Sequence, residues 1–169
     1  TAVNGRTALF KKIVGGDNID LSASGKNITI NYSGRGFIEL VSSQVTRDKK
    51  QYSDIIWSAQ GGYSNAHTTI LPRSRPSYSG INLQITNLSE GQEYTLYVTN
   101  KSKKVYRPFE EMIVYYSYGN NITDRRAAKL NDINNVDLAP GETGVVKMIS
   151  TVENNNPWSF YISSISKII

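Results

Sequence analysis

The chain of 169 residues contains no cysteine and only one histidine, His67. The absence of cysteine excludes a disulfide framework and a thiolate zinc site, and a single histidine excludes a catalytic centre built on several imidazoles. No apolar run approaches the roughly 18 residues that a membrane helix needs, so we expect no membrane insertion. The first residues are polar, lack the hydrophobic core of a secretion signal and do not include an initiating Met. We therefore expect a piece of a longer polypeptide or a processed product.

Residues that favour helices are also few, with 9 Leu and 8 Ala against 18 Ile, 11 Val and 11 Tyr. Branched and aromatic side chains suit a pleated, half-buried surface, so the composition predicts an all-β protein. Residues 123–131 are the best helix candidate, and we interpret them as one or two helical turns or a loop. The length allows one compact domain with a real core, plus a short extension.

Apolar and polar residues alternate in four segments, at 27–32, 81–86, 93–99 and 158–163. This period of two predicts strands that place one apolar row on a core and one polar row in water. We expect an antiparallel β-sandwich of the jelly-roll type.

Turn signals between these segments predict two hairpins. The first joins a strand at 18–21 to the strand at 27–32, and the second joins 81–88 to 93–100 through the turn at 89–92. A further strand at 144–151 is followed by a strong break at 154–157, before the last strand.

The organisation of the chain changes near residue 34. Residues 1–33 hold few large apolar side chains and cannot close a core alone, so they must pack on the rest of the chain or on copies of themselves. We predict an N-terminal β linking and trimerisation module at 1–33 and a β-sandwich head at 34–169, with a hinge at 34–36.

Two stretches are similar to parts of bacteriophage tail fibres. Residues 5–21 (GRTALFKKIVGGDNIDL) and 25–30 (GKNITI) resemble a module that stands just before a receptor-binding head. Residues 85–102 (ITNLSEGQEYTLYVTNKS), with 138–143 (LAPGET) and Trp158, resemble the β-sandwich heads of tail and fibre proteins. Their order, linking module and then sandwich, is that of the C-terminal region of a fibre.

The resemblance implies a virion protein of a tail or capsid fibre, outside the cell. It would form a homotrimer and bind a host cell-surface glycan or protein receptor without covalent chemistry. A trimer would also let the underfilled N-terminal strands bury their apolar rows around a shared axis. Three alternatives stay open: a structural or decoration virion protein without a receptor site, a carbohydrate-binding module or lectin of a bacterial protein, and a polysaccharide-cleaving tip.

The catalytic signals are weak. His67 lies in the polar stretch 63–69 without a nucleophile elbow, and we interpret it as a solvated loop residue. The carboxylate pairs fit a glycosidase poorly, because adjacent residues such as Glu110 and Glu111 face opposite sides of a strand. The sequence contains no complete calcium-binding loop. We therefore expect no enzymatic activity and neither a cofactor nor a metal ion.

Positive charge gathers in predicted loops, and the formal net charge is +5. Two prolines stiffen the segment 71–78 (LPRSRPSY), so its guanidinium groups lose little entropy on binding. Arginine suits phosphate and carboxylate, and aromatic rings stack on sugars, so the expected ligand is an acidic or phosphate-bearing glycan. No nucleic-acid-binding motif is present. For the basic group at 101–107, a solvated strand edge and a binding role stay open as alternatives. The candidate receptor-binding residues are Trp57, Tyr63, Arg73, Arg75, Tyr78, Lys103, Lys104 and Arg107.

Overall fold

The computed structural model describes residues 19–24, 27–32, 37–72, 78–119, 126–129, 136–153 and 156–168. The chain divides into two compact units, Thr1–Gly34 and Arg35–Ile169. This division lies one residue from the boundary expected from the sequence. The linking and trimerising roles given to the first unit stay predictions, and the proposed hinge lies outside the described residues.

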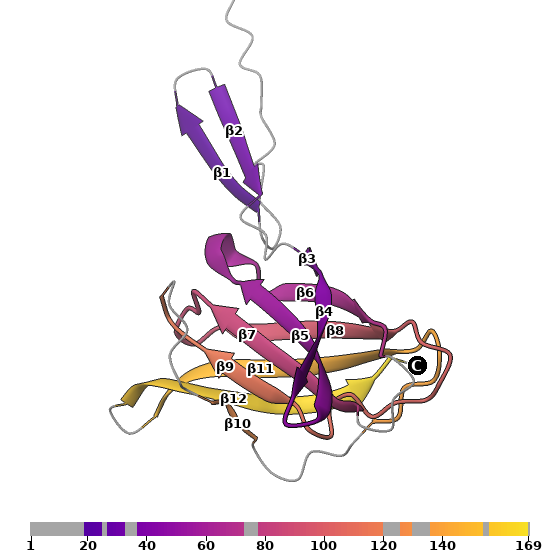
Figure 1. Cartoon of the computed structure of the whole chain (residues 1–169). Coiled ribbons are helices and arrows are strands. Elements are labelled where there is room, and N and C mark those ends of the chain that lie inside the picture. The colour runs from indigo at the N-terminus through magenta and orange to yellow at the C-terminus, as the bar shows by residue number, and fades with distance from the viewer. Residues whose placement is uncertain are drawn as a thin grey trace, which may run out of the picture. The chain divides into compact units, whose positions relative to one another are not determined.

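The first unit contains the predicted N-terminal hairpin (Figure 1). Strands β1 (Ile19–Ser24) and β2 (Asn27–Tyr32) are antiparallel, and their register runs from Ile19 opposite Tyr32 to Ser24 opposite Asn27. The antiparallel pairing of these two predicted strands is thus confirmed.

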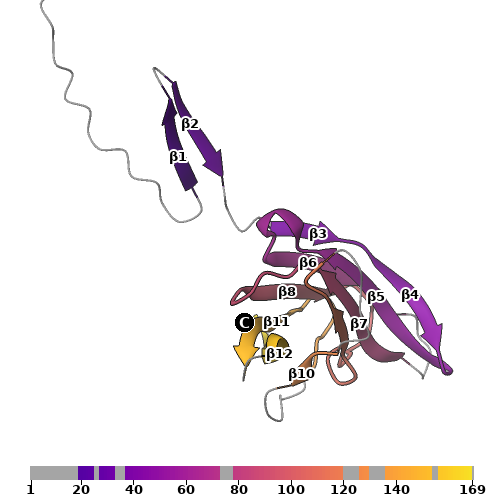
Figure 2. The ribbon, with the colours of Figure 1, turned by 90° about the vertical axis from the view of Figure 1, so that its left-hand side faces the viewer.

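The second unit contains two mixed sheets, here called the large sheet and the small sheet (Figures 1 and 2). The large sheet has the strand order β10-β12-β11-β8-β6-β3, and the small sheet has the order β4-β5-β7-β9. Strands of the large sheet are β3 (Phe37–Leu40), β6 (Asn65–Ile70), β8 (Glu93–Asn100), β10 (Ala128–Lys129), β11 (Thr143–Glu153) and β12 (Asn156–Lys167). Strands of the small sheet are β4 (Ser42–Arg47), β5 (Lys50–Ser58), β7 (Tyr78–Thr86) and β9 (Ile113–Tyr116).

One hydrophobic core draws its residues from both sheets. Along β5, Ile55 and Trp57 are fully buried in this core while Ile56 between them is 63% exposed. The same alternation along β6 buries Ala66, while the partly exposed His67 lies on the other face. The composition-based prediction of an all-β protein is confirmed. In the part of the chain that the structure describes, the one helical element is the single 3₁₀ turn η1 (Gln60–Gly62).

The antiparallel, jelly-roll-like arrangement is wrong, because both sheets are mixed. In the small sheet β5, β7 and β9 run parallel, and in the large sheet β3, β6 and β8 run parallel. From β5 to β9 the chain alternates between the small and the large sheet. Successive strands within one sheet therefore enter from the same end and point the same way. Residue alternation reports which face of a strand is buried, but it carries no information on strand direction.

The second predicted hairpin is wrong for the same reason. The turn at 89–92 does not pair its flanking strands but carries the chain from β7 in the small sheet to β8 in the large sheet. Strands β11 and β12, in contrast, pair antiparallel, and β12 begins at Asn156, within the segment 154–157 that the sequence predicts as a break. In the segment 123–131, Ala128–Lys129 forms strand β10, which pairs parallel to β12, and most of the remaining segment lies outside the described residues.

Candidate functional site

A cleft of about 510 Å³ lies where the start of β4 meets the segments that follow β6 and β8. It brings together two segments that the sequence singles out, the Pro-rich segment after β6 and the basic group after β8. Two of the candidate binding residues, Lys103 and Lys104, line it. The lining residues are Ser42, Gln44, Leu71, Pro72, Ser102, Lys103, Lys104 and Tyr106.

The basic wall of the cleft is held by the fully buried Asn100 at the end of β8. The Asn100 side-chain amide donates to the backbone oxygens of Lys104 at 2.8 Å and of Leu138 at 2.9 Å, and its oxygen accepts from the Ser102 backbone N–H at 2.9 Å. The Ser102 hydroxyl donates to the Lys104 carbonyl at 3.0 Å. The backbone that carries both lysines is therefore ordered before any ligand arrives.

The cleft carries positive charge that no carboxylate of the described residues neutralises. Within the described residues, neither Lys103 nor Lys104 has a carboxylate within ion-pair distance, although six other ion pairs are present there. Gln44 donates through Nε2 to the Ser53 hydroxyl at 3.0 Å, while its buried Oε1 has no partner among the described residues. A ligand with an anionic group complements the two lysines, whereas the buried Gln44 oxygen has no exposed surface for a ligand to contact.

Among the described residues, no other candidate residue lines the cleft. Arg107 forms an exposed ion pair with Asp137, Nε to Oδ1 at 2.5 Å. The hydrogen bond with Asp137 raises the pKa of Arg107, and the guanidinium lowers the pKa of Asp137. Tyr63 follows η1 and is 40% exposed, away from the lining residues. Tyr78 begins β7, and Arg73 and Arg75 lie outside the described residues.

The prediction that Trp57 belongs to the binding surface is wrong, because this side chain cannot stack on a sugar. Its side chain is fully buried and its ring lies edge-on to Tyr94, with a centroid separation of 5.9 Å. Trp57 follows the two apolar residues Ile55 and Ile56, so this segment shows no alternation of apolar and polar residues. The sequence therefore does not indicate which face of the strand carries Trp57.

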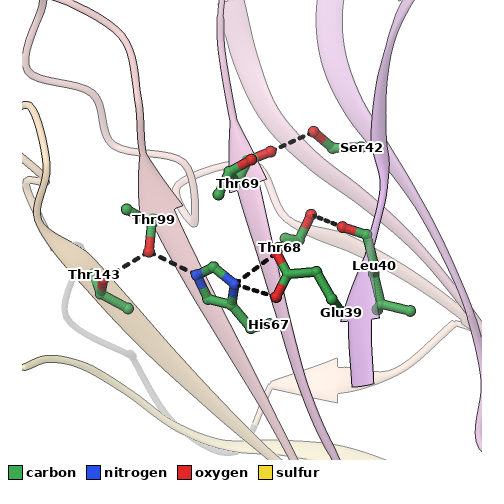
Figure 3. Close-up of polar contacts among 8 residues, drawn as sticks. All are labelled: Glu39, Leu40, Ser42, His67, Thr68, Thr69, Thr99 and Thr143. Atoms are coloured by element: carbon green, nitrogen blue, oxygen red, sulfur yellow. Dashed lines mark hydrogen bonds and ion pairs between the residues drawn. The ribbon is translucent and has the colours of Figure 1, made fainter. Parts of the chain in front are cut away.

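A second polar arrangement centres on His67, which lies in strand β6 and not in the solvated loop expected from the sequence (Figure 3). Its Nδ1 is 2.7 Å and 2.8 Å from the two carboxylate oxygens of Glu39 in β3. Its Nε2 is 2.8 Å from the hydroxyl of Thr99 in β8, which in turn lies 2.7 Å from the hydroxyl of Thr143 in β11. One imidazole thus connects four neighbouring strands of the large sheet.

This arrangement has the residue order of a hydroxyl–histidine–carboxylate triad, but its geometry does not suit acyl transfer. The carboxylate of Glu39 is the most exposed group, with 61% side-chain exposure against 23% for His67, whereas the acid of a triad is buried. Thr99 is followed by Asn100 and Lys101. Their backbone N–H groups donate hydrogen bonds to the backbone oxygens of Glu142 and Ile70, at 2.9 Å each. They are not free to stabilise an oxyanion.

The described ranges contain no group of three or more acidic, histidine or cysteine side chains placed to hold a metal ion. None of their helices is long and apolar enough to cross a bilayer.

Comparisons with protein families, with curated proteins and with solved structures found no match to this chain.

Proposed function

We propose that the chain is the C-terminal head of a trimeric viral fibre and attaches to a host cell-surface glycan without covalent chemistry. The observation that carries the proposal is the cleft, which is lined by Lys103 and Lys104 on a backbone that the buried Asn100 holds in place. Ligand binding there requires no ordering of the wall, which lowers the entropic cost of association.

The ligand class follows from the groups that line the cleft. Two ammonium ions without carboxylate partners in the described part of the chain favour an anionic group, either a carboxylate or a phosphate. The lining also contains the polar residues Ser42 and Gln44 and the aromatic residue Tyr106, a mixture that suits a sugar. We therefore assign the cleft to an acidic or phosphate-bearing sugar. Each contact is weak, and threefold display would raise the avidity.

Two features of the architecture support a fibre head. The apolar rows of both sheets contribute to one core, and this supports a β-sandwich head. The hairpin β1–β2 belongs to a separate unit that is similar in sequence to a fibre linking module, and this supports attachment to a shaft.

The cleft assignment predicts the behaviour of the double variant Lys103→Ala/Lys104→Ala. We expect it to bind polysaccharides that carry uronic acid or phosphate about tenfold or more weakly than the unchanged chain, because charged hydrogen bonds are lost. Thermal stability should stay unchanged, since both side chains are solvated. Isothermal titration calorimetry against alginate, a phosphomannan and neutral dextran measures the effect.

A matched control removes the same charge elsewhere. Lys49→Ala/Lys147→Ala also lowers the formal net charge of +5 by two, at the turn between β4 and β5 and on β11. It should leave affinity nearly unchanged. Equal losses in both double variants would show attraction by net charge alone and would remove the cleft from the proposal.

A further inference from the structure

An aromatic cluster lies on the outer face of the large sheet, on β3, β6 and β8. The ring of Phe37 is stacked beside the imidazole of His67, with centroids 6.2 Å apart and an interplanar angle of 18°. It also lies 5.8 Å from the ring of Tyr97, tilted by 44°. Phe37 is 61% exposed, so one apolar ring faces water with two others at its side.

A carboxylate is fixed next to this ring. Glu39 lies two residues beyond Phe37 on the same strand, and therefore on the same face. The two-point contact with Nδ1 of His67 fixes its orientation, and His67 is held in turn by Thr99. A carboxylate has about four acceptor positions, so Glu39, with 61% side-chain exposure, keeps acceptors for other donors.

We propose that this face is a second binding site, for a neutral sugar ring. The apolar C–H face of a pyranose stacks on Phe37, while two neighbouring hydroxyls donate to Glu39. The site is distinct from the cleft, which contributes cations and no carboxylate, and the inference goes beyond the proposed function. A cationic ligand is disfavoured, because His67 already faces Glu39 and the chain has a formal net charge of +5.

The test is an NMR titration of the full chain with the methyl glycosides of glucose, galactose, mannose and N-acetylglucosamine. We expect at least one glycoside to shift the resonances of Phe37 and Tyr97 with a millimolar dissociation constant. Phe37→Ala should weaken this binding by about fivefold or more. Glu39→Gln, which leaves the Phe37 ring in place, should also weaken the binding. Val105→Ala, which shortens another exposed apolar side chain, should not.

Three results overturn the inference: no shift with any glycoside up to about 100 mM, equal binding by Phe37→Ala, or shifts caused by choline in place of sugars. Backbone amide spectra of each variant verify that the sheet is intact, and Glu39→Gln tests the site even if Phe37→Ala alters the strand. Lys103→Ala/Lys104→Ala should bind glycosides normally. Failure of the cleft and failure of this site are thus separate outcomes.

Discussion

At the scale of single residues, Trp57 dominates the core. It is among the largest fully buried side chains, and it packs edge-on against Tyr94. Tyr94 places its hydroxyl against the Ser89 backbone N–H at 2.7 Å, and burial raises the pKa of that hydroxyl. The indole Nε1 of Trp57 is buried without a partner among the described residues. The ring therefore stabilises the fold while its N–H group costs stability.

This balance predicts two different outcomes at one position. Trp57→Ala should lower the free energy of unfolding by about 3–5 kcal/mol, because it leaves a large cavity. Trp57→Phe retains an aromatic ring and removes the unpaired donor, so we expect a loss below about 2 kcal/mol. Urea unfolding followed by far-UV circular dichroism measures both. The neighbouring exposed Ile56→Ala is the control. A loss in Trp57→Phe as large as in Trp57→Ala would contradict the account.

At the scale of elements, the turn at 139–142 joins the ends of three strands. The Glu142 carboxylate accepts from the Ala139 backbone N–H at 2.7 Å and from Lys167 Nζ at 3.0 and 3.1 Å. These contacts, the Ala139 bond first, lower the pKa of Glu142 below its usual 4.5. The Asn100 backbone N–H donates to the Glu142 carbonyl at 2.9 Å. The turn thus connects the start of β11 to the ends of β8 and β12 through hydrogen bonds and an ion pair.

Because the folded state lowers the pKa of Glu142, its contribution is present above the unfolded value and disappears as the pH falls through the folded value. Glu142→Gln should therefore be less stable than the unchanged chain at about pH 7, and the difference should shrink below about pH 4.5. Urea unfolding at several pH values measures this. Glu90→Gln, in the exposed turn 89–92, is the control. A difference that persists at about pH 2 would show that the carboxylate charge is not responsible.

The elements differ in how far their sequence predicts them. The hairpin β1–β2 follows from a short turn between two short strands, whereas for β11 and β12 the sequence predicts two strands and a break between them but not their pairing. The strands β7 and β8 are also located correctly, yet their pairing is not, because a turn such as 89–92 suits both a hairpin and a crossing between sheets. The partner of each strand is decided by the shared core, which local patterns do not encode.

At the scale of the whole molecule, we expect the chain to form a trimer in solution. If the underfilled N-terminal strands bury their apolar rows against sister copies, the full chain should elute at three times its 18.8 kDa. Size-exclusion chromatography with light scattering at micromolar concentration measures the mass. A monomer would argue against a fibre head and leave the lectin-like alternative, since cleft binding does not require a trimer.

The cleft was only partly predictable from the sequence. Lys103 and Lys104 are visible as part of a basic cluster, but Ser42 and Gln44 are ordinary polar residues of an edge strand. The arrangement of Glu39, His67 and Thr99 is likewise invisible, because three separate strands supply its groups. Sites built across parallel neighbours depend on the topology, and the alternating pattern leaves the topology open.

The interleaved path of β5 to β9 has a consequence during synthesis. Strand β5 can pair with its parallel neighbour β7 only after β6, which belongs to the other sheet, has been synthesised. In the same way, β6 can pair with β8 only after β7 has been synthesised. Nascent chains would expose unpaired strand edges until much of the polypeptide has left the ribosome. Such non-local order makes for folding in milliseconds to seconds rather than microseconds, and it would favour production with chaperones at low temperature.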